Sequence, residues 1–207
     1  MGFLDYFRGP GPIRDAGALA DFIDKQAAFV VQKGIYEYSR ARAGHYAKVL
    51  FKEPDFQAAC DVSRWRAYPI GLAMVTEVVE GVLRPSAAGE EGRQREALVA
   101  LVLAIFDRYP VPAAIGESAW SDLRAELERR LKLVGFHPTK WAKDVPEQFA
   151  EGYFNLLPIH EKLRGRDFPT TRSYLRVTMT NVHDQLSTRL DAPAAVKSLL
   201  AGPVAAN

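Results

Sequence analysis

The sequence predicts an all-α fold, an irregular bundle of about seven to nine helical segments. Apolar residues recur at spacings of three and four along most of the chain, which is the period of an amphipathic helix. No stretch alternates apolar and polar residues convincingly, as a half-buried strand does. The chain has 207 residues, 48% of them hydrophobic, so it can bury a sizeable core without disulfides.

The predicted helical domain spans residues 15–201. An extended segment, residues 1–14, precedes it, and a frayed tail, residues 202–207, follows it. The sequence RPSAAGEEGR, residues 84–93, is the clearest internal loop, because it gathers proline, glycine and charged residues. We expect this loop to be flexible.

The first helix is predicted to begin after Asp15 and to extend to Phe51. Asp15 can cap it, because a carboxylate accepts hydrogen bonds from the free N–H groups of the first turn. Gly34 and Gly44 are weak points where we expect the helix to bend or break, since glycine lowers helix stability.

The second helix is predicted to start at Pro54, because proline suits the first turn. Pro69 is expected to kink or restart this helix, since proline lacks the N–H donor and clashes with the preceding turn. Residues 70–83, IGLAMVTEVVEGVL, are apolar on most faces, so we place them at the centre of the core.

The second half of the chain is predicted to contain five further helical elements. They are a buried helix over 94–109, an amphipathic helix ending at Gly135, short segments that open at Pro138 and break at Pro158, a long helix capped by Thr170 or Thr171, and a last helix capped by Asp191.

The composition excludes several classes of protein. The net charge is only +2, so charge alone does not indicate nucleic-acid binding. The single cysteine, Cys60, cannot form an internal disulfide and suits a reducing cytoplasm, and its apolar neighbours predict a buried, unreactive thiol. The longest apolar run, residues 97–106, would give a helix of about 15 Å, half of a bilayer core, so no transmembrane segment is predicted.

No familiar catalytic motif occurs in the chain. The string nearest to a nucleophile elbow, around Ser118, lacks the second glycine and follows no strand. Glycine-rich phosphate loops are absent. The four histidines are far apart, and no two lie four residues apart as in helical zinc sites. We therefore predict no catalytic residue, no metal site and no cofactor, and we favour a non-enzymatic protein over an enzyme.

Glu77 and Glu80 are candidate buried acids, because they share one face of the otherwise apolar segment 70–83. A buried carboxylate must find a partner or take up a proton. One interpretation is a structural ion pair with Arg64 or Arg66. The other is an acid or base that faces an internal cavity.

The stretch GIYEYSRARAGHY, residues 34–46, concentrates tyrosine and arginine. Helical spacing places Tyr38, Arg42 and Tyr46 on one line, where the arginine can stack between the two rings. Arg40 lies on a neighbouring line. The alternative to stacking is a pocket for an anionic group, since arginine supplies a planar fork of donors and tyrosine a hydroxyl.

Trp65 and Arg66 belong to a second basic and aromatic stretch, SRWRAYP. The tryptophan is either a packing anchor beside Pro69 or part of a binding site. A third basic stretch contains Lys162, Arg164, Arg166, Arg172 and Arg176. Basic residues among aromatics also suit phosphate contacts and base stacking, but no nucleic-acid-binding signature accompanies them, so we regard nucleic acid as an unlikely partner.

IYEYSRARAG together with SRWRAYPIGLAMVTEVVEG resembles an uncharacterised family of all-helical bacterial, alphaproteobacterial proteins, some of which are labelled esterases. The resemblance covers mainly residues 20–83. It implies a bacterial cytoplasmic protein. It transfers no catalytic residue and no substrate, because no nucleophile elbow or triad can be placed in this chain.

From these observations we expect a non-enzymatic, cytoplasmic binding or adaptor protein. Its partner is either another protein or an anionic, partly apolar small molecule held between helices. The sequence is also compatible with a homo-oligomer. A hydrolase or lipid-modifying enzyme with an internal cavity is the alternative, and a nucleic-acid binder is the second alternative. The predicted ligand-binding residues are Tyr38, Arg40, Arg42, Trp65 and Arg66.

Overall fold

The computed structural model describes residues 11–202, to which all structural statements below refer. Nine α-helices in this part of the chain confirm the all-α prediction, and its only β-type pairing is an isolated bridge. The helices are α1 (Ala16–Ala43), α2 (Ala47–Leu50), α3 (Pro54–Leu83), α4 (Glu91–Phe106), α5 (Glu117–Leu131), α6 (Ala150–Asn155), α7 (Glu161–Arg164), α8 (Phe168–Arg189) and α9 (Ala192–Leu200). Short 3-10 helices lie at Gly44–Tyr46, Arg84–Ala87 and Ala142–Gln148.

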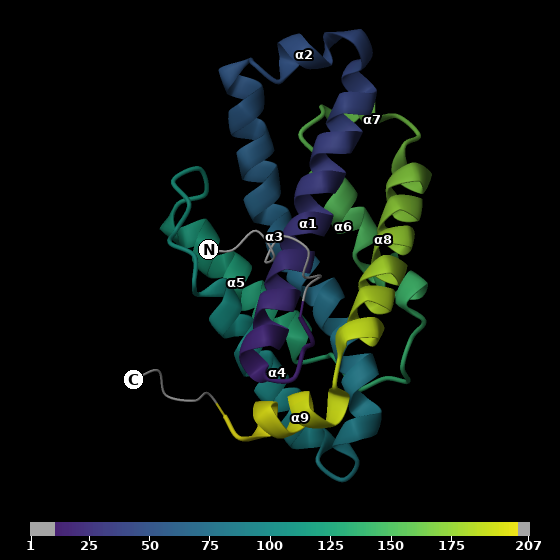
Figure 1. Ribbon diagram of the computed structural model, residues 1–207. Coiled ribbons are helices and arrows are strands. Elements are labelled where there is room, and N and C mark those ends of the chain that lie inside the picture. Colours follow the sequence, from purple (N-terminus) through teal and green to yellow (C-terminus); the bar gives the residue numbers. More distant parts are fainter. Residues whose placement is uncertain (1–10, 203–207) are drawn as a thin grey trace, which may run out of the picture.

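The long helices α1 and α3 form an antiparallel hairpin through the middle of the molecule, and α2 crosses between them at one end (Figure 1). Helices α4 and α5 pack on one side of this hairpin and α8 on the other. Helix α9 closes the end opposite α2 (Figure 1). No helix in the described range is long and apolar enough to cross a membrane.

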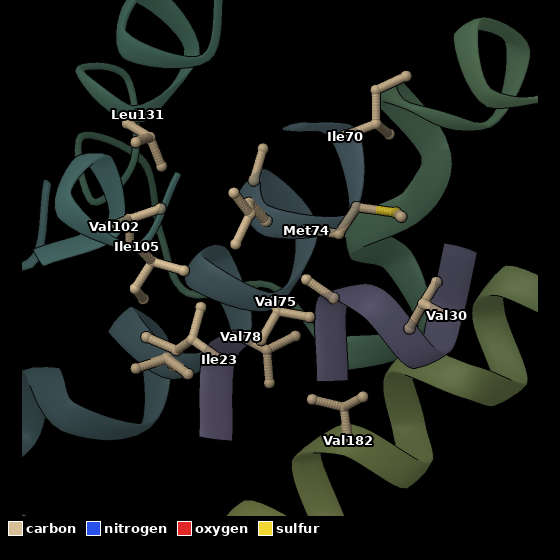
Figure 2. Packing of buried hydrophobic residues seen from close by; sticks show 14 of the residues in the cluster. Ile23, Val30, Ile70, Met74, Val75, Val78, Val102, Ile105, Leu131 and Val182 are labelled. Atoms are coloured by element: carbon tan, nitrogen blue, oxygen red, sulfur yellow. The ribbon is translucent and has the colours of Figure 1, made fainter. Parts of the chain in front are cut away.

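The second half of α3 is the centre of the core, as predicted. Every residue from Ala67 to Glu80 is buried, so this helix is surrounded on all sides. In Figure 2, the labelled side chains of α3 lie between residues of α1, α4, α5 and α8; they are Ile70, Met74, Val75 and Val78. A helix that is apolar all round gains its stability from this burial rather than from one amphipathic face.

Pro69 does not restart the second helix, because α3 continues through it from Pro54 to Leu83. An interior proline costs about 3 kcal/mol in an isolated helix. Pro69 is buried among the core residues of α3, and the burial of the surrounding apolar surface offsets this cost. The prediction of a break at Pro158 is confirmed, since α6 ends at Asn155 and α7 begins only at Glu161.

The two glycines of the first helix behave differently. Gly44 ends α1 with a φ of +53°, as predicted. Gly34 stays inside α1 and serves close packing instead. A Cβ at this position would lie 2.2 Å from the hydroxyl oxygen of Tyr153 and 2.7 Å from a ring carbon of Tyr174. The two tyrosines donate hydrogen bonds to Val31 and Val30 carbonyls of α1, so the missing side chain lets them approach the backbone.

Several predicted boundaries are corrected by the structure. The loop expected at 84–93 is reduced to residues 88–90, because a 3-10 helix fills Arg84–Ala87 and α4 begins at Glu91. Helix α8 begins at Phe168, before Thr170, since Pro169 fits its first turn. Helix α5 ends at Leu131, short of Gly135.

The predicted caps and ends have a mixed outcome. Asp15 and Asp191 cap α1 and α9 through hydrogen bonds from backbone N–H groups, as expected. The described part of the N-terminal segment is anchored, because Ile13 is fully buried and pairs with the backbone beside Leu190. The remainder of the N-terminal segment, residues 1–10, and the tail at 203–207 lie outside the described residues.

Candidate ligand-binding site

Glu77 and Glu80 are both buried, as predicted, with 6% and 3% of their surface exposed. Their predicted partner was wrong, because neither acid pairs with Arg64 or Arg66. Since α3 is continuous, 11 to 16 residues of helix separate those arginines from the acids, or about 16–24 Å along the axis. Such a pair would require the chain to turn back at Pro69, whereas α3 continues through this residue.

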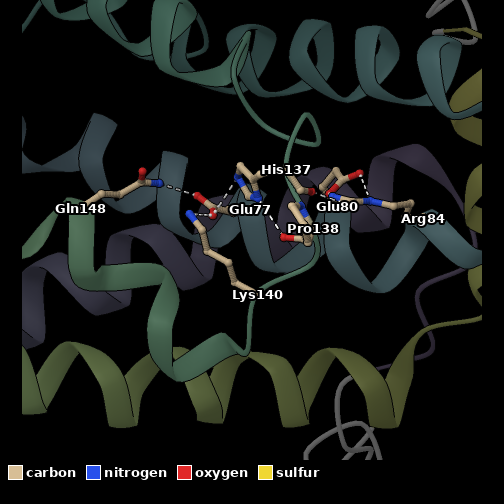
Figure 3. A network of polar contacts seen from close by, with 7 residues as sticks. All are labelled: Glu77, Glu80, Arg84, His137, Pro138, Lys140 and Gln148. Atoms are coloured by element: carbon tan, nitrogen blue, oxygen red, sulfur yellow. Dashed lines mark hydrogen bonds and ion pairs between the residues drawn. The ribbon is translucent and has the colours of Figure 1, made fainter.

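Glu77 is bound by three side chains from the segment after α5 (Figure 3). Lys140 Nζ lies 2.7 Å from Oε1, and Gln148 Nε2 donates to Oε2 at 2.8 Å. His137 Nε2 lies 3.3 Å from Oε1. Both carboxylate oxygens therefore have partners, which is what a buried charge requires.

Glu80 is bound by Arg84, one turn later on the same chain. The arginine contacts the two carboxylate oxygens at 2.9 and 2.6 Å, in the bidentate geometry that favours this pair. A third guanidinium nitrogen donates to the carbonyl of His137 at 3.0 Å. The hydrogen bond to Glu80 raises the pKa of the Arg84 guanidinium. The pair thus fixes the backbone near His137 (Figure 3).

We define residues 132–141 as the strap, the non-helical connection from α5 to the 3-10 helix at Ala142. Two glycines allow it to lie against α3. Gly135 has a φ of +83°, and a Cβ there would lie 3.0 Å from a carboxylate oxygen of Glu80. A Cβ on Gly81 would lie 2.9 Å from the methyl group of Thr139. The two buried acids and these two glycines together attach the strap to α3.

A groove of about 660 Å³ lies between α3, α8 and the strap, and Glu77 contributes to its wall. Trp141, on the strap, is 78% exposed, which is unusual for so large an aromatic side chain. The lining residues are Glu77, Val78, Gly81, Val82, Pro85, Thr139, Lys140, Trp141, Ala142, Lys143, Thr180, His183 and Asp184.

The groove combines an apolar surface with cations. Val78, Val82 and Pro85 provide carbon surface beside the Trp141 ring. Lys143 is exposed and makes no ion pair within residues 11–202. Aromatic and aliphatic walls with a few convergent polar groups are typical of small-molecule sites. An unpaired ammonium group beside them favours a ligand that carries a negative charge.

Glu77 also lines a smaller cavity of about 220 Å³ on the side of α5. That cavity contains Arg129, Arg130 and His137. Both arginines pair with Glu126, so each already has a carboxylate partner. The larger groove is the better candidate site because Lys143 has no carboxylate partner within residues 11–202.

Tyr38 and Arg42, two of the predicted site residues, meet at Asp167. The Tyr38 hydroxyl donates to this carboxylate at 2.9 Å, and Arg42 Nε lies 3.3 Å from it. Burial and the hydrogen bond to Asp167 raise the pKa of Tyr38 to about 12. The predicted stacking of Arg42 between Tyr38 and Tyr46 was wrong, because Asp167 from the distant start of α8 binds the guanidinium group instead.

The other predicted site residues lie elsewhere. Arg40 forms an exposed pair with Glu37 at 3.2 Å. Arg66 is exposed and lines a separate groove of about 390 Å³ against α5. Trp65 belongs to an aromatic cluster, with ring centroids 5.4 Å from Tyr109 and 5.7 Å from Trp120. The five residues therefore do not line one cleft, and Trp65 is a packing residue.

The remaining basic and thiol groups have structural surroundings. Arg172 pairs with Glu147, and Arg176 pairs with Glu147 and Asp144, so these two arginines of the third basic stretch have two carboxylate partners. Cys60 is half-buried rather than fully buried, and burial raises the pKa of its thiol. A raised pKa disfavours the reactive thiolate, in agreement with an unreactive cysteine.

Sequence reasoning missed the groove residues Lys140, Trp141 and Lys143. The string GFHPTKWAK, residues 135–143, contains glycine, proline, an aromatic residue and two lysines. That composition is a loop signal, but we interpreted it as the start of a helical segment at Pro138. Nothing in this string indicates that Lys140 binds the carboxylate of Glu77, 63 positions earlier in the chain.

Comparisons of the chain with protein-family models, curated proteins and solved structures gave no significant match, so the assignment of this site rests on its geometry and chemistry.

Proposed function

We propose that the protein binds a small molecule with one anionic group and an apolar portion, held in the groove between α3, α8 and the strap. The observation that carries this proposal is the exposed Trp141 ring beside the unpaired Lys143 in a groove of about 660 Å³. The ring and the carbon surface of α3 suit the apolar portion. The ammonium group suits a carboxylate, sulfonate or phosphate.

A binding role is favoured over acid–base catalysis by the state of Glu77. Both of its oxygens accept hydrogen bonds from protein side chains. A general base needs an oxygen within reach of the substrate proton. Glu77 instead holds Lys140 in the groove wall as an ion pair, which leaves Lys143 as the unpaired lysine of the groove lining.

A fluorescence titration with 8-anilinonaphthalene-1-sulfonate tests the proposal, because this probe combines aromatic rings with a sulfonate. We expect Trp141→Ala and Lys143→Ala each to weaken probe binding by about tenfold, since each removes roughly one favourable contact of 1–2 kcal/mol. Phe136→Ala is the matched control, since Phe136 is an exposed aromatic of the same strap outside the groove. Lys132→Ala is the control for charge.

The controls decide the interpretation. Equal losses in the groove variants and in the two controls would assign the probe to general adsorption. Unchanged binding in Trp141→Ala and Lys143→Ala would remove the groove as the site. Circular-dichroism melting of all four variants verifies that each retains its fold.

A further inference from the structure

The turn between α1 and α3 forms an exposed surface at the end of the hairpin, separate from the groove. We define the apex as residues 44–52, which turn the chain from α1 through α2 towards α3. Figure 1 shows α2 at the extreme end of the molecule, across the ends of the two long helices. The apex is therefore accessible to a large flat partner.

The charged residues of the apex itself are all basic, and the exposed acids Glu53 and Asp55 follow it directly along the chain. Residues 38–52, YSRARAGHYAKVLFK, contain four arginines and lysines, one histidine and no acidic residue. The whole chain has a net charge of only +2, so this concentration is local. Arg40 and Arg42 are paired with Glu37 and Asp167. Lys48 and Lys52 are exposed and make no ion pair within the described residues.

The apolar side chains of the apex are exposed between these lysines. Tyr46 is 75% and Val49 is 57% exposed. Phe51 anchors the apex to the two long helices, because its ring centroid lies 4.8 Å from that of Tyr36 and 5.3 Å from that of Phe56. The exposed side chains are thus presented on a packed base rather than on a free loop.

This combination favours a lipid surface over nucleic acid. Tyrosine is typical of the headgroup region of a bilayer, aliphatic side chains insert below it, and lysine stems extend back to the headgroups. In a nucleic-acid site, valine has no stacking role, and both neighbouring arginines are already paired with carboxylates. The free charges at the apex are ammonium groups, which suit an anionic headgroup layer.

We propose that the apex docks the protein onto membranes that contain anionic phospholipid, with Tyr46 and Val49 at the interface and with Lys48 and Lys52 on the headgroups. The attachment is peripheral and reversible, because a few side chains bury little apolar area. It is independent of the groove, which lies beside the strap.

Vesicle co-sedimentation tests this proposal, with equal parts phosphatidylcholine and phosphatidylglycerol compared with phosphatidylcholine alone. We expect the wild-type chain to bind the anionic vesicles only, and less at high salt. Lys48→Gln/Lys52→Gln should weaken binding about twenty- to thirtyfold, from about fivefold per lysine. Lys25→Gln/Lys197→Gln, the matched control, makes the same charge change on exposed helix positions outside the apex and should leave binding unchanged. Val49→Ser should weaken binding without changing its salt dependence.

Failure of the wild-type chain to bind anionic vesicles would overturn the proposal, as would equal losses in the apex and control pairs. The alternative result is a wild-type chain that binds a single-stranded oligonucleotide and no vesicles. If Lys48→Gln/Lys52→Gln then lost oligonucleotide binding, the apex would be assigned to nucleic acid. The variant Lys48→Gln/Lys52→Gln should still bind 8-anilinonaphthalene-1-sulfonate. This result distinguishes failure of the membrane-docking proposal from failure of the proposed ligand groove.

Discussion

Glu77 is the residue on which the candidate site depends most. Three donors reach its buried carboxylate from a segment that begins some 60 residues later in the chain. The sequence predicted that this acid is buried, because it interrupts an apolar helix. Its partners could not be predicted, since they lie on a connection whose path is set by the packing of α5 and α8.

Glu77→Gln should lower the free energy of unfolding by about 3 kcal/mol, because it leaves Lys140 and His137 without their anion. The value is at the low end for a buried pair, since both partners are partly exposed. Glu37→Gln breaks an exposed pair with Arg40 and should cost less than about 1 kcal/mol. Urea unfolding of both variants measures the difference, and equal costs would contradict a structural role for Glu77.

Gly34 illustrates packing that residue preferences do not reveal. Gly34→Ala should destabilise the protein by about 1–3 kcal/mol, because the new Cβ would overlap the Tyr153 hydroxyl. Gly92→Ala, in the open part of α4 with no atom near the new Cβ, should stabilise it by about 0.5–1 kcal/mol. Thermal melting compares them, and a stabilising Gly34→Ala would show that the tyrosines move aside freely.

At the scale of elements, the predictions succeeded where local chemistry decides. The caps at Asp15 and Asp191 and the proline at the start of α3 are short-range signals, and all three appear in the structure. The restart at Pro69 failed because tertiary burial outweighs the intrinsic cost of an interior proline. The strap was missed because its conformation follows from contacts with α3 rather than from its own sequence.

The strap should be sensitive to Gly135. Gly135→Ala adds a side chain at a φ of +83° and brings it against Glu80 and Arg95. Gly89→Ala adds one at a φ of +86° with no atom nearby. Both variants carry the strain of about 1 kcal/mol for a positive φ, so the additional loss in Gly135→Ala reports the packing of the strap. Chemical denaturation measures both, and an equal loss would show that the strap is not tightly held.

At the scale of the whole molecule, the spacing of apolar residues predicted the fold class. It did not predict which residues form the candidate site. The five predicted binding residues share aromatic and basic character, but Asp167, Glu37 and the aromatic cluster around Trp65 bind four of them in separate places, and Arg66 lines another groove. Composition identified residue types suited to a ligand. Only the three-dimensional arrangement decides which of them stay free, and the groove residues come from α3, α8 and the strap.

The whole fold should weaken at alkaline pH. Burial is the largest cause of the raised pKa values of five tyrosines, Tyr38, Tyr68, Tyr109, Tyr153 and Tyr174. A pKa raised above its unfolded value of about 10 contributes stability below that pH and loses it as pH rises. For Tyr38 and Tyr174, with a pKa of about 12, the loss falls between pH 10 and 12.

Tyrosinate absorbance and melting temperature, followed together from pH 9 to pH 12, should show cooperative unfolding coupled to ionisation. Complete titration of all tyrosines near pH 10 with an unchanged melting temperature would contradict the raised pKa values of these five phenols.

The central claim, a ligand groove at Trp141, is tested most directly by the indole N–H signals of the three tryptophans in a ¹⁵N-labelled protein. Trp120 is buried and Trp65 is packed among aromatic rings, whereas Trp141 lines the groove. On titration with 8-anilinonaphthalene-1-sulfonate, the Trp141 signal should shift and saturate while the other two stay in place. A shift of the Trp65 signal with Trp141 unchanged would contradict the account and return the site to the aromatic stretch predicted from sequence.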